Sequence, residues 1–420
     1  MAVPTVLLLV VTALALAMVS VLGSISTQRG SVRDQDSKTA LAAADAGVNR
    51  ALWRQNKMPP GDGFFCAGNE VPSSGWCPAK TGQVGDAAWS YQVSAPDAGG
   101  VIKIVSTGTR DGVSRKVSLL SRKMSGAEVF GGERVMSKED IFMDSDARIE
   151  VPVGTNGDFH LDSNAEVCGN MRYGVGESVT FLSNAQQCPG YSMTSGDREI
   201  PPLFKPGLAT ANDNGRFFSQ DIRSSSSEVT WNATTRTLTL NSNGTLTVGG
   251  GNYFICRLVL DSNSRLYMAS GAASRFYFDK PENCPSLPAD PQNPSAKSQF
   301  WMSSNTEISS TGYNPALGNF DLLGFYFFGS TSIATTIHLN SNASVTNELV
   351  IYAPDSDVHM NSNSTYIGAI ASKSLHMDSN AVITSDSNMP PPLIDIAPFH
   401  IKGRYVECAT TVTGTPDAGC

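Results

Sequence analysis

The chain has 420 residues and a formal net charge of −8, from 30 basic and 38 acidic residues. This length exceeds what one ordinary hydrophobic core organises and predicts two or three units, while the absence of a basic block excludes nucleic acid as an expected partner. Charged residues make up only 16% of the chain, and Gly, Ser, Thr and Asn take their place, which favours strands and turns over surface helices.

The N-terminal segment is uncharged through residue 28, and residues 6–22 are almost wholly apolar. At about 1.5 Å per residue, such a stretch can cross most of a bilayer as a helix. A cleavable secretory signal is the alternative, because residues 13–15 and 15–17 both read Ala-Leu-Ala and fit the small-x-small rule. No positive n-region precedes the apolar run, an absence that a basic leader removed from in front of Met1 would explain.

The same helix is expected to continue well beyond the apolar run. Residues 36–53 are rich in Ala and contain no Pro, and their apolar positions recur at helical spacing. Pro59, Pro60 and Gly61 end the pattern, so the sequence predicts one helix over 1–57, about 80 Å long. Half of that helix would lie in lipid and half outside it, a length more typical of filament subunits than of single-span anchors.

The sequences MAVPTVLLLVVTALALAMVSVLG at 1–23 and ALAAADAGVNRAL at 40–52 resemble the type IV pilin superfamily, specifically its PilX-type minor pilin-like members. The resemblance implies that a prepilin peptidase removes a short basic leader and methylates the new N-terminus. Thr5 stands where most major pilins carry an acid that pairs with a neighbour's amine, which leaves self-polymerisation open. The expected assembly residues of the helix are Met1, Thr5, Val6, Leu8, Val11, Leu14 and Leu22. The alternative is a membrane anchor followed by a juxtamembrane helix.

Residues 58–125 predict a small antiparallel β subdomain. Strand-type runs lie near 89–94, 101–109 and 114–121, and Asp111-Gly112 between the last two is a strong hairpin signal. Such a sheet would cover the apolar face of the outer half of the helix. Cys66 and Cys77 bound a short loop before the first strand, and their proximity makes a local disulfide the simplest pairing.

From residue 143 a short motif recurs: an apolar residue, then Asp, Asn or Ser, then Ser-Asn and usually a small residue. Asn164 to Asn184 and Asn243 to Asn263 are each 20 residues apart, and the gaps between other copies are close to one, two or three such periods. The repeated motif predicts a solenoid, namely a parallel β-helix whose strands stack about 4.8 Å apart. Asn suits the bend because it tolerates the left-handed conformation, and its amide can form a ladder between coils. The ladder residues are Asn164, Asn184, Asn243, Asn263, Asn305, Asn342, Asn363 and Asn380.

The later copies, best represented by residues 349–387, resemble the β-helical, polymer-forming-type domain that often follows PilX-type N-termini. The expected fold class is therefore α+β, mostly β: a long pilin helix at 1–57, an antiparallel sheet at 58–125 and a right-handed parallel β-helix at 126–400. Residues 401–420 are expected as a separate C-terminal tail that carries a disulfide.

Two long inserts interrupt the repeat, at about 186–236 and 279–300, and the second is too rich in Pro to remain in a ladder. Loops on a rigid scaffold commonly carry recognition, so these inserts are the candidate contact surfaces. None of the eight cysteines forms a C-x-x-C pair, which argues against a zinc ribbon or thioredoxin-type site and for structural disulfides. Their connectivity stays open; besides Cys66 with Cys77, the pairs nearest in sequence are Cys168 with Cys188, Cys256 with Cys284, and Cys408 with Cys420.

Four histidines occupy one position of the repeat: His160, His338, His359 and His376. The last three should stack on consecutive coils, facing away from the core because the following residue faces in. We interpret them as a polar ladder, with a metal strip as the weaker alternative. Asp355, Asp357 and Asp378 could bind calcium, but no EF-hand or nonapeptide calcium repeat accompanies them. The carboxylates are scattered singly, without the pairing that glycosidases require, so neither an enzyme nor a cofactor is expected.

Together these features predict a structural subunit of an extracellular type IV pilus-like filament. Expected partners are other copies or other pilins, the inner membrane before assembly, the pilus assembly machinery and prepilin peptidase, and a surface or glycan ligand. The rival interpretations are a monomeric membrane-anchored adhesin and a minor pilin that acts at the filament tip.

Overall fold

The computed structural model describes residues 3–57, 75–98, 100–124, 128–203, 205, 207–219, 221–225, 227–269, 273–310, 323–330, 332–385, 399–409 and 415–420. The side chains at 3–27 are not among the described features. The chain divides into two compact units: unit 1 comprises residues 1–124 and 398–420, and unit 2 comprises residues 125–397.

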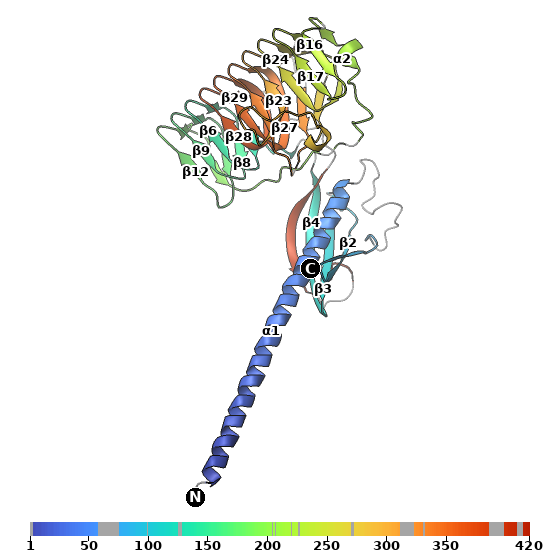
Figure 1. Cartoon of the computed structure of the whole chain (residues 1–420), viewed down its shortest axis with the longest axis vertical. Coiled ribbons are helices and arrows are strands. Elements are labelled where there is room, and N and C mark those ends of the chain that lie inside the picture. The colour runs from blue at the N-terminus through green and yellow to red at the C-terminus, as the bar shows by residue number, and fades with distance from the viewer. Residues whose placement is uncertain are drawn as a thin grey trace. The chain divides into compact units, whose positions relative to one another are not determined.

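Helix α1 of unit 1 is a single element, Val3–Lys57 (Figure 1). Its buried face lies in the Ala-rich part of the chain, where Ala40, Ala44, Ala51 and Leu52 pack on the sheet of unit 1. The helix and the sheet approach closely because small residues line the contact: a Cβ on Gly108 would lie 1.9 Å from the carbonyl oxygen of Ala40. Among the described side chains of the helix, those at 30–35 are exposed, and the contact with this sheet begins at about residue 36.

The sheet of unit 1 is antiparallel, with the strand order β1-β2-β3-β4-β30. Its strands are β1 (Lys80–Val84), β2 (Ala87–Val93), β3 (Val101–Arg110), β4 (Val113–Met124) and β30 (Phe399–Cys408). The predicted meander and its cover over the helix are confirmed, and Asp111 (φ 46°) and Gly112 (φ 79°) form the predicted hairpin turn. The expected separate tail at 401–420 is wrong, because β30 pairs along β4 and brings the C-terminus into unit 1.

Unit 2 contains a 25-stranded sheet whose pairing is mostly parallel. Its first run of strands is β5 (Val135–Ser137), β6 (Ile141–Met143), β7 (Arg148–Ile149), β8 (Val153–Thr155), β9 (Phe159–Leu161), β10 (Glu166–Val167), β11 (Met171–Tyr173), β12 (Val179–Phe181), β13 (Gln186–Gln187) and β14 (Met193–Ser195). Within this run each strand pairs with the third strand along the chain, as β5 does with β8 and β6 with β9.

The second run follows a crossing segment that holds helix α2 (Arg216–Ser219) and strands β15 (Ile222–Arg223) and β16 (Val229–Asn232). Its strands are β17 (Thr237–Leu240), β18 (Thr245–Val248), β19 (Gly251–Ile255), β20 (Arg257–Leu260), β21 (Arg265–Met268), β22 (Ser274–Phe278), β23 (Lys297–Met302), β24 (Glu307–Ser310), β25 (Leu323–Phe327), β26 (Thr335–Leu339), β27 (Ser344–Met360), β28 (Thr365–Met377) and β29 (Val382–Thr384). Alternate side chains fill the interior: Leu238, Leu240, Leu246 and Val248 are fully buried.

The two runs meet out of chain order, at a contact that we call the seam. Strand β28, near the end of the second run, pairs in parallel with β5 and β6, and β29 pairs with β7. The first run therefore extends away from the seam toward β12, while the second run begins at the far end beside β16 and α2 (Figure 1). Arg134 and Glu348 join the two runs through a largely buried ion pair at 2.5 Å.

The expected fold class needs correction in two respects. The chain is a mostly-β protein and not an α+β one, because strands form most of its regular secondary structure, and α2 and the 3-10 turn Pro281–Asn283 are short. Nothing in the described geometry marks α1 as a pilin helix. The expected right-handed parallel β-helix over 126–400 is also wrong as a single solenoid, because the strand that adjoins β28 comes from more than 200 residues earlier in the sequence, at β5.

None of the helices, over the residues that the structure describes, has the length and apolar character needed to cross a membrane. The expected transmembrane segment is therefore unsupported. Met1 lies outside the described residues, as do the side chains of the other expected assembly residues, Thr5, Val6, Leu8, Val11, Leu14 and Leu22.

Candidate functional site

The repeated Asn residues form a ladder, but through the backbone. All eight adopt the left-handed conformation, with φ between 59° at Asn342 and 69° at Asn184, as does Asp146 in the degenerate first copy. Except at Asn184, the last copy of the first run, the amide N–H of each of these residues donates to the carbonyl of the repeat Ser on the adjacent coil. The pattern continues across the seam, where Asn380 donates to Ser145 at 3.2 Å. The side-chain amide rung lies two residues earlier in the repeat, where Asn361 donates to Asn340 at 2.6 Å.

We expect the left-handed conformation to decide which substitutions the ladder tolerates. At the exposed Asn363 (φ 59°), a change to Ala should destabilise unit 2 by about 1 kcal/mol more than a change to Gly, because only Gly adopts this backbone without steric cost. Urea unfolding of the two variants measures the difference. Ser362→Ala in the same turn serves as a control for loss of a polar side chain. Equal losses for the Ala and Gly variants would contradict this explanation of the repeat.

A column of stacked rings runs along one outer face of unit 2. His338, His359 and His376 are in register on β26, β27 and β28, as expected, with ring centroids 4.9 Å and 5.8 Å apart. The column continues past the seam, where the ring of His376 lies 6.0 Å from Phe142, and Phe142 lies 4.7 Å from His160. The residues that follow the three histidines, Leu339, Met360 and Met377, are fully buried, so the histidines face away from the core.

His338 differs from the rest of the column because the second insert covers it. The side chains of His338 and Asp290 are both fully buried, and Nε2 of His338 lies 2.5 Å from Oδ2 of Asp290. Burial tends to raise the pKa of Asp290, but hydrogen bonds from Thr336, the Gln292 N–H and His338 outweigh it and hold the pKa below its ordinary value. In the middle of the column, burial and the neighbouring His338 and His376 lower the pKa of His359 to about 4, which keeps its imidazole neutral near pH 7.

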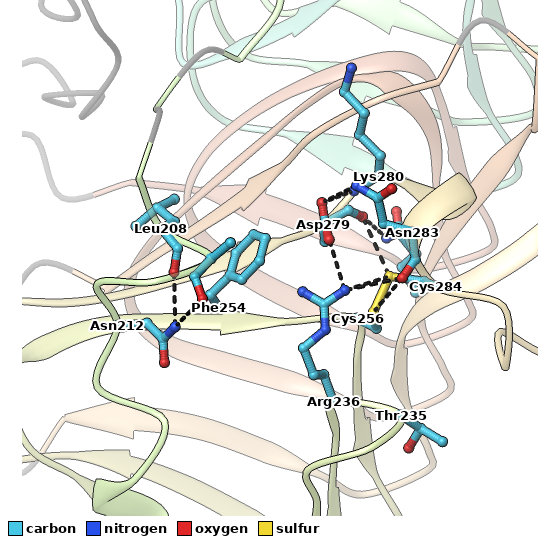
Figure 2. Close-up of polar contacts among 12 residues, drawn as sticks. Leu208, Asn212, Thr235, Arg236, Phe254, Cys256, Asp279, Lys280, Asn283 and Cys284 are labelled. Atoms are coloured by element: carbon cyan, nitrogen blue, oxygen red, sulfur yellow. Dashed lines mark hydrogen bonds and ion pairs between the residues drawn. A yellow bond between two sulfur atoms is a disulfide. The ribbon is translucent and has the colours of Figure 1, made fainter.

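The second insert leaves the ladder after β22 and is pinned at its base (Figure 2). Arg236 donates to Oδ2 of Asp279 at 2.7 Å and to the carbonyl of Asn283 at 3.1 Å. The Cys256–Cys284 disulfide lies beside these contacts and joins the insert to the end of β19. The insert is therefore held at two points, at its base by Arg236 and the disulfide and further along by Asp290. The first insert begins later than expected, because β13 and β14 still belong to the stack.

The stacked histidines do not form a shared metal site. The planes of His338 and His359 are inclined by only 15°, and Nε2 of His338 is bonded to Asp290, so the nitrogen lone pairs do not converge on one point. Of the three acidic neighbours, Asp355 and Asp357 contact lysines at 2.8 Å and 3.5 Å. Asp378 lies instead beside His376, together with Asp144 from the other side of the seam. The sequence interpretation missed Asp144, because Asp is common at its position of the repeat, as at Asp162 and Asp378, and nothing local marks it.

Three of the expected disulfides are present: Cys168–Cys188, Cys256–Cys284 and Cys408–Cys420. Cys77 is disulfide-bonded, and Cys66, its expected partner, lies outside the described residues. Cys168 and Cys188 lie beside Glu166, but their bonded sulfurs are not thiolate ligands, so this cluster has no metal-binding capacity.

Residues 193–390 match a family described as a domain of unknown function, DUF7305. The match covers less than half of the chain and contains the second run of strands. No curated protein matches the chain in sequence. A solved structure that is similar to this one is the competence-associated pilin ComZ from Thermus thermophilus, at 11% identity, over 89% of this chain and 97% of that chain, with a TM-score of 0.22. A likeness at that score carries no argument about fold or function.

Proposed function

We propose that this chain is a non-enzymatic structural subunit of an extracellular type IV pilus-like filament, which assembles through α1 and displays unit 2 for contact with surfaces. The observation that carries the proposal is that the sheet of unit 1 covers one part of a single continuous helix. Helix α1 extends from Val3 to Lys57, and the sheet of unit 1 packs against it from about residue 36 onward, whereas residues 30–35 are exposed. The apolar run 6–22 precedes this part of the sequence, and a run of that length needs an apolar environment.

A bundle of equivalent helices supplies that environment. If the apolar run of each copy packs against those of its neighbours, the contact is heterologous, and repeating it produces an open filament instead of a closed ring. In this proposal the inner membrane holds the helix before assembly, so apolar burial is maintained throughout. Prepilin peptidase and the pilus assembly machinery are then the processing and assembly partners, and other copies or other pilins are the neighbours in the filament.

Two features of the rest of the chain support an extracellular location and a display role. The three disulfides of the described residues favour an oxidising compartment outside the cytoplasm. Unit 2 is a rigid stack with inserts that leave its ladder, and the second insert is fixed by a disulfide and by a buried histidine–carboxylate pair. Fixed loops on such a scaffold suit the recognition of a surface or a glycan.

The replacement Leu8→Asp tests the assembly step. A charge in the apolar run should abolish filaments in the fraction sheared from the cell surface, because it cannot be buried against an apolar neighbour without a large cost. Ser31→Asp, at an exposed position of the same helix, is the matched control and should leave filaments intact. Circular dichroism melting should show unit 2 folded in both variants. Normal filaments from Leu8→Asp would refute the proposal.

The amount of the chain in sheared filaments separates this proposal from its rivals. A shaft subunit dominates the purified fibre, whereas a minor pilin at the tip, which Thr5 favours, is present in traces. A monomeric membrane-anchored adhesin stays with the membrane fraction and is absent from the fibre.

A further inference from the structure

The seam places three carboxylates on neighbouring rungs of the repeat. Strand β28 pairs with β6 so that Met377 is opposite Met143, and the next residues, Asp378 and Asp144, follow on adjacent coils. Asp162 occupies the same repeat position one coil further, after Leu161. On the other side of Asp378 the position is held by the amides of Asn361 and Asn340. Carboxylates therefore replace amides at the place where the two runs meet.

This replacement has an electrostatic cost within the chain. Asn361 and Asn340 bond to each other at 2.6 Å, but two ionised carboxylates only accept hydrogen bonds and cannot form such a rung. Like charges on directly adjacent strands also repel each other. Asp162 accepts a bond from the N–H of Ser163 at 2.7 Å, which engages one of its oxygens locally. A cation beside Asp144 and Asp378 would relieve the remaining repulsion.

An imidazole completes the arrangement. Nε2 of His376 lies 3.2 Å from Oδ1 of Asp378 and 3.4 Å from Oδ2 of Asp144, and the three atoms lie within 4.8 Å of one another. Zinc bonds of about 2.1 Å in a tetrahedral site separate two ligand atoms by about 3.4 Å. The two contacts of His376 already have that spacing, so an ion needs little rearrangement to bind. The side chains of His376, Asp144 and Asp378 are 37%, 49% and 36% exposed. An ion can therefore enter the site, and water can complete its coordination.

We propose that His376, Asp144 and Asp378 bind one divalent transition-metal ion of the zinc class across the seam. A ligand set of one imidazole and two carboxylates suits such an ion, whereas calcium requires six to eight oxygens. The ion would connect β28 to β6 between residues that are 232 positions apart in the chain, and would thereby fasten the two runs together. The site lies wholly in unit 2, so it does not depend on the role proposed for α1.

The test variants place at each site residue a side chain that already occupies the equivalent position on a neighbouring coil. Asp378→Asn and Asp144→Asn each install the amide found at Asn361, and His376→Phe installs the ring found at Phe142. His359→Phe makes the same ring change one coil away and is the control. Calorimetric titration of the full chain with Zn²⁺ should show one ion bound per chain in the wild type and in the control. We expect the affinity to fall at least about tenfold in each of the other three variants.

A second readout is the melting temperature of unit 2. Saturating Zn²⁺ should raise it in the wild type and in His359→Phe, and should do so much less in Asp378→Asn, because only an ion that binds the folded seam stabilises it. Unchanged zinc affinity in the three site variants would overturn the proposal. So would an equal loss of affinity in His359→Phe, or displacement of the ion by millimolar Ca²⁺ or Mg²⁺.

Discussion

Replacing Asp290 with Ala is expected to destabilise unit 2 by about 3–5 kcal/mol and to release the second insert. The cost is large because the side chains of Asp290 and His338 are both fully buried and 2.5 Å apart. Nδ1 of His338 already has no hydrogen-bond partner among the described residues, so the variant would leave both ring nitrogens unsatisfied in the interior. Asp290 also accepts the N–H of Gln292 at 2.7 Å, which shapes the turn of the insert.

Urea unfolding measures the loss of stability, and limited proteolysis measures the release, as faster cleavage within 280–296. Gln292→Ala, at an exposed position of the same insert, is the control and should change neither. The double variant Asp290→Ala with His338→Phe should recover much of the lost stability, because no buried imidazole nitrogen then lacks a partner and an aromatic ring already occupies this column at Phe142. A double variant no more stable than Asp290→Ala alone would contradict the buried pair as the cause.

Replacing Phe276 with Ala is expected to cost about 3–5 kcal/mol, through loss of apolar contact and the cavity left behind. The Phe276 ring is fully buried, and its centroid lies 4.8 Å from that of Tyr253, 5.4 Å from Phe325 and 6.3 Å from Phe217. Because these rings come from successive coils and from α2, the interior around them cannot close without moving several strands. Phe217 also covers the end of the stack where the second run begins.

Urea unfolding again provides the measurement for Phe276. Phe276→Leu keeps most of the volume and should cost less than about 1.5 kcal/mol. Tyr267→Ala removes a ring from a partly exposed position of β21 and should have a small effect. If Phe276→Ala unfolds with the same free energy as Tyr267→Ala, the aromatic stack does not organise this end of unit 2.

Local features of the fold were readable from the sequence because each depends on a few neighbouring residues. Asp111-Gly112 predicted a hairpin since its turn needs two positive φ angles, and the repeated Asn predicted the left-handed bends for the same reason. Alternation within each copy predicted which side chains face inward, as at Leu339 and Met377. The three described disulfides join cysteines that are 12 to 28 residues apart, so short separation was a sufficient guide.

The order in which the coils stack could not be predicted from the sequence, because every copy of the repeat presents the same backbone hydrogen-bonding groups to its neighbours. The N–H of Asn380 bonds to Ser145 as well as any copy bonds to its neighbour in sequence, so the repeat gives no information on which coil adjoins which. Chain order was the default assumption, and it failed at the seam. The burial of His338 could not be predicted for a related reason. The residue that covers it, Asp290, belongs to an insert that does not follow the repeat.

The sequence alone determined the repeat, the bends, the inward faces, the helix over residues 36–52 and the nearby disulfides, because local sterics and apolar periodicity fix them. The tertiary structure alone decided that β28 adjoins β6, that β30 completes the sheet of unit 1, and that Asp144 meets His376 and Asp378. Those contacts join segments far apart in the chain through pairings that many strands could satisfy equally well. Which of these pairings forms depends on how the whole set of strands packs together, and no local sequence pattern predicts it.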